Sequence, residues 1–176
     1  GLDARYMIEH LDMADAVASL TTLCTPHRGS PIASFILRYP SWILQCIAFW
    51  INLWYRIFGD RYPNAISVCH QLQLHPQATP DTLPQVYCQS FSTTLQKSKD
   101  DFVMGIPLLF SHHLERDASD GLVSRQSTKF GEYRGDCVDD SVSHSEIVDF
   151  MAKRKKKERI YGFYLQLCRE LAEKGL

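Results

Sequence analysis

The chain has 176 residues, 45% of them apolar and 22% charged, a composition that excludes a disordered or fibrous protein and fits one globular domain. Its formal net charge of −1 gives no whole-chain attraction for nucleic acid, and we expect no nucleic-acid partner. The six cysteines form no Cys-x-x-Cys pair and no group with histidines, so we expect no zinc site. They favour a reducing compartment, although their even number also fits disulfides in a secreted chain.

The first elements of the chain should be a helix and a strand. The sequence begins at Gly1 without an initiator methionine or the pattern of a signal peptide, and we expect a segment of a longer protein. Leu2 to Leu11 carries apolar residues at roughly helical spacing. Val17 to Cys24 is β-branched and apolar and stops at a Thr-Pro pair, which predicts a short buried strand. Helix, strand and loop in this order are half of an α/β repeat.

The most apolar stretch runs from Trp42 to Phe58. Gln45, Asn52 and Arg56 interrupt it, and they fall close together on a helical wheel, as a narrow polar stripe on a broad aromatic face. A membrane span needs about 20 largely uncharged residues. We therefore predict an amphipathic helix that is either packed in the core or applied to lipid.

Two further strands and a closing helix follow. Gln85 to Phe91 predicts the second strand, and Tyr133 to Val138 predicts a weaker third one. From Glu158 onward apolar residues repeat every three or four positions, which predicts an amphipathic helix. The basic run from Lys153 to Arg159 is interpreted as a solvated loop or helix start, with a nuclear address or an anionic-lipid contact as alternatives.

No complete catalytic motif is present, because the sequence lacks Gly-x-Ser-x-Gly, a phosphate-binding glycine loop and His-Glu-x-x-His. Two polar sites follow predicted strands, at Ser119 to Val123 and at Ser143 to Glu146. The acid and the histidine of a hydrolase are customarily carried on such loops, where they converge from distant sequence. A plainer alternative stays open, since an Asp-Gly pair is also typical of a turn and a histidine in a polar loop of solvent exposure.

Three segments carry a further pattern. Residues 1–6 are Gly-Leu-Asp-Ala-Arg-Tyr, residues 19–30 are Ser-Leu-Thr-Thr-Leu-Cys-Thr-Pro-His-Arg-Gly-Ser, and residues 119–144 run from Ser-Asp-Gly-Leu-Val through Lys-Phe-Gly-Glu-Tyr to a histidine. In this order they resemble lipases of the α/β-hydrolase fold, particularly the fungal triacylglycerol lipases of mitochondrial type and, more remotely, the bacterial true lipases. The first resembles the helix start after the nucleophile elbow Gly-His-Ser-Met-Gly, the second their strand and following loop, and the third the segment bearing their acid and histidine.

The resemblance implies an α/β protein with a partial α/β-hydrolase fold. We expect about three C-terminal strands of a parallel sheet with flanking helices, in one domain at 1–176 that contains a lid-like helical insertion at 31–75. By the same match Asp120 is the triad acid and His144 the general base. The family's serine would lie three residues before Gly1, so we expect this chain to be inactive by itself.

Two features depart from the family pattern. Relatives often have Asp-His-Leu around the histidine, whereas His144 lies in Val-Ser-His-Ser-Glu. His112 and His113 precede the acid and suit the order serine, acid, histidine poorly. Bacterial relatives bind calcium near the histidine, and Glu146 could imitate one ligand, with a surface glutamate as the alternative; otherwise no cofactor or metal is expected.

As a lid, the aromatic helix would cover the acyl site in water and turn its apolar face onto a lipid–water interface. The side chains expected on that face are Trp42, Phe49, Trp50 and Trp54. The resemblance thus implies an acylglycerol or another lipid ester as partner, and a mitochondrial or lipid-associated location inside the cell, although the compartment stays open.

Two other functions stay open. One is a non-catalytic lipid-binding or interaction module derived from a hydrolase fold, in which the absence of the serine is a real loss. The other is a hydrolase of the same fold that acts on phospholipid, a simple ester or an acyl acceptor, which the shape of the pocket would decide.

Overall fold

The computed structural model describes residues 1–58, 83, 85–101, 104–105, 107–109, 117–149 and 152–176. In this part of the chain, a three-stranded sheet has the order β1 (Ser19–Leu23), β2 (Tyr87–Thr94), β3 (Glu132–Ser141). Both neighbouring pairs run parallel. The predicted class, a partial α/β fold with three parallel strands and flanking helices, is confirmed.

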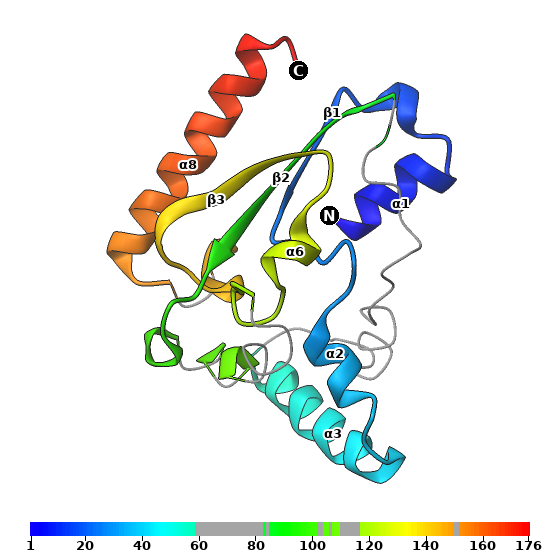
Figure 1. Cartoon of the computed structure of the whole chain (residues 1–176), viewed down its shortest axis with the longest axis vertical. Helices are drawn as coiled ribbons and strands as arrows, with labels where there is room; N and C mark the ends of the chain where they lie inside the picture. The colour runs from blue at the N-terminus through cyan, green and yellow to red at the C-terminus, as the bar shows by residue number, and fades with distance from the viewer. Residues whose placement is uncertain (59–82, 84, 102–103, 106, 110–116, 150–151) are drawn as a thin grey trace.

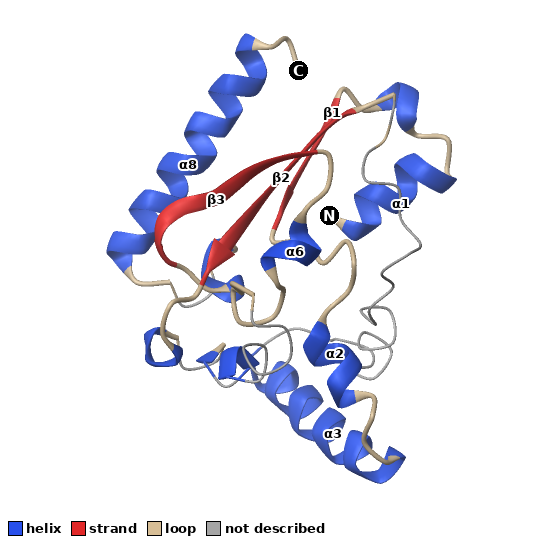
Figure 2. Ribbon diagram, viewed as in Figure 1, coloured by secondary structure: helices blue, strands red, loops and turns tan. Residues whose placement is uncertain are grey.

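Helices occupy the connections and the end of the chain (Figures 1 and 2). The α-helices are α1 (Leu2–His10), α2 (Pro31–Ile36), α3 (Ser41–Phe58), α6 (Arg125–Thr128), α7 (His144–Ile147) and α8 (Arg154–Glu173). Two short 3₁₀ turns are η1 (Ala14–Ala16) and η2 (Ser98–Asp100). In Figure 1, α8 lies on one side of the sheet and α1 on the other.

Two apolar clusters pack against the two faces of the sheet. On the side of α8, Phe91 and Cys137 from the strands meet Ile160 and Leu167 from the helix. On the side of α1, Ile8 packs with buried residues of β1, β2 and the segment before β3. Burying apolar side chains on both faces is what a parallel sheet requires, because its connections cross over it.

The strand and helix limits differ from the predictions at their ends. β1 begins at Ser19 rather than Val17, because the chain first forms the turn η1. β3 extends to Ser141 although its first half alternates charged residues, which made it look weak in the sequence. α8 begins at Arg154, so most of the basic run forms the first turns of the helix, which is the second of the two forms expected for it.

The predicted aromatic helix is present as α3, and it leaves aromatic side chains in water. Trp42 and Trp50 are each 66% exposed and Phe49 is 60% exposed, so these side chains do not fit the alternative of a helix packed in the core. Trp54 belongs to α3, but its side chain falls outside the described residues, as do positions 59–75 of the predicted insertion. Among the helices that are described, none has the length and apolar character needed to cross a bilayer.

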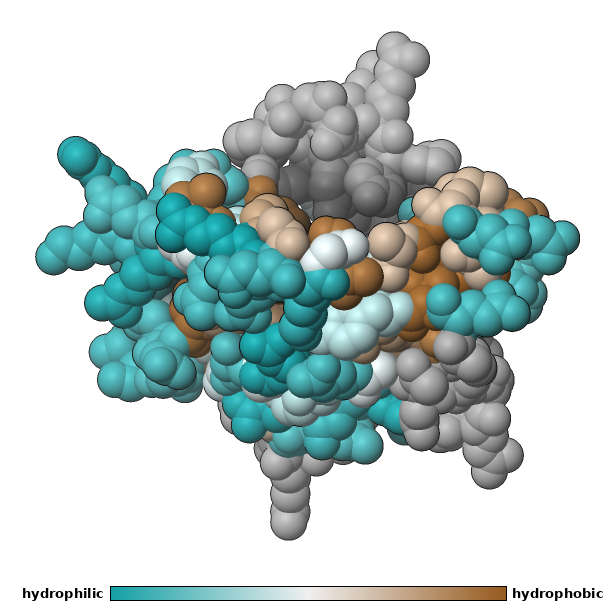
Figure 3. Space-filling view, turned by 90° about the horizontal axis from the view of Figure 1, so that it is seen from above, coloured by the Kyte–Doolittle hydropathy of each residue, from teal (hydrophilic) through white to brown (hydrophobic). Residues whose placement is uncertain are grey.

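The end of the molecule opposite α3 has a different surface. Seen from that end in Figure 3, the surface is hydrophilic over α8, and apolar colouring appears on the side of α1. Met7 and Leu11 are exposed there. Among the described residues, the exposed tryptophan side chains lie on α3, at the other end of the molecule.

Candidate functional site

The loops that follow the strands meet at the carboxyl edge of the sheet. Just beyond β1, the Cys24 amide donates to the Phe91 carbonyl at 2.9 Å, and beyond β3 the Val142 amide donates to the Thr94 carbonyl at 3.1 Å. The Leu95 amide donates to the Ser119 carbonyl at 2.9 Å, which joins the 119–123 loop to this edge. In Figure 1 the arrow of β2 points toward the end of the molecule where α2 and α3 lie.

Asp120 is held in this loop by its own backbone neighbours. Its Oδ1 accepts hydrogen bonds from the amides of Leu122 at 2.9 Å and Val123 at 2.7 Å. Gly121 has a φ of +102°, and a Cβ there would lie 2.8 Å from Met104, so both conformation and space require glycine. The carboxylate is fully buried, and its orientation leaves Oδ2 for a second partner.

That partner is His144, at the first position of α7. Its Nδ1 lies 2.7 Å from Asp120 Oδ2, and its backbone amide donates to the Asp120 carbonyl at 3.0 Å. Burial alone would lower the pKa of His144, but the charge and hydrogen bond of the Asp120 carboxylate outweigh it and raise that pKa above 6.5. Nδ1–H therefore donates to the carboxylate.

The other ring nitrogen of His144 is available for chemistry. The side chain keeps 29% of its surface exposed, and among the described residues no hydrogen bond occupies Nε2. A histidine oriented by a buried carboxylate, with the opposite nitrogen open, can take a proton from a hydroxyl that approaches it. The structure thus brings Asp120 and His144 together, while His112 and His113 lie outside the described residues.

Cys24 lies beside Asp120, with which its thiol interacts. Its φ is +51°, and its Sγ lies 3.2 Å from Thr93 Oγ1. Burial, and secondly the negative charge of Asp120, raise the pKa of this thiol well above 9. Cys24 therefore stays a protonated thiol at ordinary pH and is unsuited as a substitute nucleophile.

The start of α1 lies at the same edge. A Cβ on Gly1 would come within 2.1 Å of Thr25 Oγ1, so the two residues are in close contact just beyond β1. Arg5 in the first turns is buried, lies over the Phe130 ring at 4.4 Å and contacts His27 Nδ1 at 3.4 Å. Burial, then the charge of Arg5, lower the pKa of His27 to about 3, so His27 remains neutral and serves packing rather than proton transfer.

The segment that leads to α3 is tied to the loop of the acid. Ser30, directly before α2, is fully buried, and its hydroxyl donates to the Leu122 carbonyl at 2.8 Å. Leu122 also donates its amide to Asp120. The base of the predicted lid segment therefore contacts the loop that holds the carboxylate.

Glu146 departs from one of the two alternatives considered for it in the sequence. It is 3% exposed, so the surface-glutamate alternative is wrong. Both of its carboxylate oxygens contact the ammonium group of Lys156, at 2.8 and 2.7 Å, and the role of a calcium ligand stays a prediction. Within the described residues, no group of three His, Cys, Asp or Glu side chains is arranged to hold a metal ion.

The sequence interpretation missed the contacts around His144. Ser143 and Glu146 form a capping box at the start of α7, and the Ser-x-x-Glu spacing could have predicted it. Asp101, which lies far away in sequence, accepts hydrogen bonds from the hydroxyls of Ser143 and Ser145. No local pattern signals that contact.

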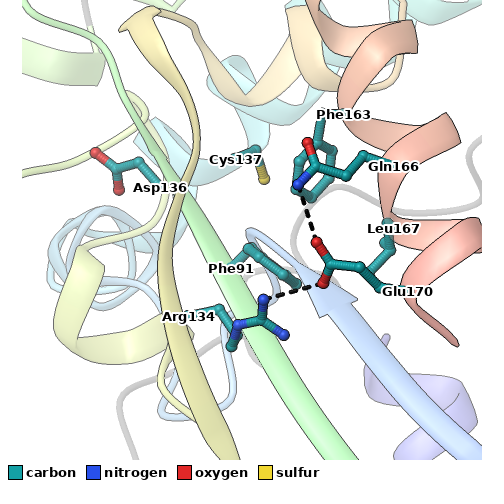
Figure 4. Close-up of a pocket in the computed structure, with 8 residues that line it drawn as sticks. All are labelled: Phe91, Arg134, Asp136, Cys137, Phe163, Gln166, Leu167 and Glu170. Atoms are coloured by element: carbon teal, nitrogen blue, oxygen red, sulfur yellow. Dashed lines mark hydrogen bonds and ion pairs between the residues drawn. The ribbon is translucent and has the colours of Figure 1, made fainter. Parts of the chain in front are cut away.

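A hollow elsewhere in the molecule is not part of this site. A cavity of about 180 Å³ lies between the sheet and α8, lined in part by Phe91, Arg134 and Glu170 (Figure 4). The Glu170 carboxylate already pairs with Arg134 at 3.0 Å and accepts from Gln166 at 2.9 Å. Asp120 and His144 do not line this cavity, and its paired polar groups offer no reactive centre.

Comparison with known proteins gives one informative similarity. No family model matches the chain. A curated protein of Saccharomyces cerevisiae, "Triacylglycerol lipase 2", is 28% identical over 199 residues, an alignment that covers 99% of this chain and 55% of the yeast protein. The chain thus spans about half the length of this relative. The similarity supports a relationship with a lipase-like family.

Proposed function

We propose that this chain carries the acid and the base of a serine ester hydrolase that acts on acylglycerols or related lipid esters. The observation that carries the proposal is the 2.7 Å contact between His144 Nδ1 and Asp120 Oδ2 at the carboxyl edge of a parallel sheet. This is where open α/β sheets place their reactive groups. The similarity to a yeast triacylglycerol lipase supports the choice of ester as substrate class.

In the proposed mechanism, Nε2 of His144 removes the proton from a serine hydroxyl as the serine oxygen attacks the ester carbonyl. The imidazolium then returns this proton to the departing alcohol, and a water molecule repeats the sequence to release the acid. Asp120 keeps the proton on Nδ1 and stabilises the cation that forms. The two backbone amides that donate to Oδ1 hold the carboxylate in place.

The attacking serine, in this proposal, precedes Gly1 in the encoded protein. The 176 residues contain no Gly-x-Ser-x-Gly, and the start of α1 lies beside the loop that follows β1, at the edge where the acid and the base are found. A nucleophile on a sharp turn before this helix would also use the helix N-terminus for its oxyanion. The chain alone is therefore expected to be inactive.

The proposed role of α3 is that of a lid belonging to an insertion at 31–75. Its exposed aromatic side chains suit contact with a lipid surface, and Ser30 connects the start of this segment to the loop of the acid. A movement of the segment would then displace the loop that holds Asp120. The same exposed face favours a second candidate function, a lipid-binding module without chemistry.

Labelling with a fluorophosphonate probe separates the two functions. The protein should be produced with the residues that precede Gly1 in its transcript, and in parallel as residues 1–176. We expect His144-dependent labelling of a serine before Gly1 in the longer protein and no labelling of the shorter one. Labelling that survives His144→Ala contradicts the assignment of His144 as the base. A longer protein that binds phosphatidylcholine vesicles without being labelled contradicts the hydrolase proposal and supports the module.

A further inference from the structure

The orientation of His144 depends on a helix too short to be stable by itself. α7 has four residues, and a single helical turn in water does not offset the entropy of ordering it. What closes the turn is the capping box, in which the Ser143 amide donates to Glu146 Oε2 at 3.0 Å and the Glu146 amide donates to Ser143 Oγ at 3.2 Å. His144 lies between the two capping residues.

The carboxylate that closes the box is buried and lies against a lysine side chain. Glu146 is 3% exposed, and a buried carboxylate without a partner is strongly disfavoured. Lys156, ten residues later in α8, places its Nζ 2.8 and 2.7 Å from the two oxygens of this carboxylate. The Lys156 side chain is only 13% exposed, so the pair is shielded from water and screening is weak.

A second carboxylate approaches the same turn. Asp101 Oδ2 accepts from Ser145 Oγ at 2.9 Å and also from Ser143 Oγ. Both neighbours of His144 in the sequence are thus tied to one acidic side chain. Asp101 thus brings a second carboxylate to the turn that holds Glu146, and like charges beside one turn favour a nearby cation.

Lys156 differs in this respect from the other basic residues of its run. Lys155 is exposed, and Lys157 pairs at 2.6 Å with Asp149, which is itself partly exposed. The basic run was interpreted from the sequence as a solvated loop or helix start. It is a helix start, but Lys156 is not solvated, because its ammonium group lies against the turn that bears His144.

We propose that Lys156 is a positioning residue for His144: by neutralising the buried carboxylate of Glu146 it keeps the capping box of α7 closed and the imidazole directed at Asp120. The inference rests on the proposed function only in naming His144 as the base. The contact that it explains, His144 Nδ1 to Asp120 Oδ2, exists in this chain whether or not an ester is hydrolysed.

The experiment observes the imidazole N–H proton of His144 directly. In residues 1–176, this proton is hydrogen-bonded to Asp120 and should give a slowly exchanging, far-downfield proton resonance, assigned by its loss in His144→Gln. We expect Lys156→Met to remove or broaden the resonance and Lys155→Met, the matched control, to leave it unchanged. Lys156→Arg, which retains the charge, should keep at least half of its intensity.

A double variant tests whether Lys156 acts by compensating the carboxylate of Glu146. In Glu146→Gln/Lys156→Met the side chain at 146 is neutral and can still accept from the Ser143 amide, since glutamine also serves in a capping box. We expect the resonance to return. A Lys156→Met protein that keeps the parent resonance overturns the proposal. A double variant that lacks the resonance also overturns it, whether that variant is folded or unfolded. Should the resonances behave as expected while the longer protein hydrolyses no ester, the positioning role stands and the proposed function fails.

Discussion

Replacing Trp42 and Trp50 with serine should weaken binding of the chain to phosphatidylcholine vesicles. Each indole is 66% exposed on α3. A tryptophan side chain presents up to about 250 Å², so the two leave about 330 Å² in water. If half of that area leaves water at the lipid surface, about 25 cal/mol per Å² gives about 4 kcal/mol, which corresponds to roughly a thousandfold change in the partition coefficient.

Vesicle sedimentation measures this partition coefficient, and circular dichroism checks that the fold is kept. Because the indoles are exposed, we expect the unfolding midpoint to stay unchanged, and the loss of binding to be at least about a hundredfold once serine's own small contribution is allowed for. A matched control replaces Tyr6 and Leu165, which are 57% and 60% exposed on α1 and α8. The lid interpretation is wrong if both double variants lose binding equally, or if the tryptophan variant loses less than threefold.

Two further predictions concern the histidines. Asp120 raises the pKa of His144 above 6.5, so an activity that needs the neutral base should rise with pH through a midpoint above 6.5. Asp120→Asn should move the midpoint of an NMR titration of His144 to lower pH. An unchanged midpoint contradicts this assignment. His27 has its pKa lowered to about 3, so the unfolded state binds more protons between pH 6.5 and 3, and stability should fall by up to about 1.4 kcal/mol for each unit of decrease in pH. The free energy of unfolding, measured with urea at several pH values, should change less with pH in His27→Gln than in the parent. An identical dependence on pH would refute the burial argument.

The sequence predicted which helices and strands form more accurately than it predicted where they begin and end. β1, β2 and α3 follow from apolar periodicity and turn residues, which are local signals. β3 runs longer than predicted because its charged residues alternate on a partly exposed strand, and its cross-strand partners in β2 are distant in the sequence. The parallel direction of the strands followed from the resemblance rather than from periodicity, and their order was not predicted.

The candidate site, too, could be predicted only in part from the sequence. Asp120 and His144 could be named from the sequence because a family pattern marks both positions. The second carboxylate near the histidine, Asp101, could not be named, because its contacts with Ser143 and Ser145 join residues more than 40 positions apart. Lys156 was hidden within a run of like residues, and only its packing against Glu146 distinguishes it.

The most direct test of the account is ester hydrolysis by the protein produced with the residues that precede Gly1, in the parent and in His144→Ala. His10, an exposed histidine on α1, provides the matched control as His10→Ala. We predict that kcat/KM for a triacylglycerol falls by at least about a thousandfold in His144→Ala and stays within twofold in His10→Ala. A His144→Ala protein that retains a tenth or more of the parent activity contradicts the assignment of His144 and Asp120 as base and acid.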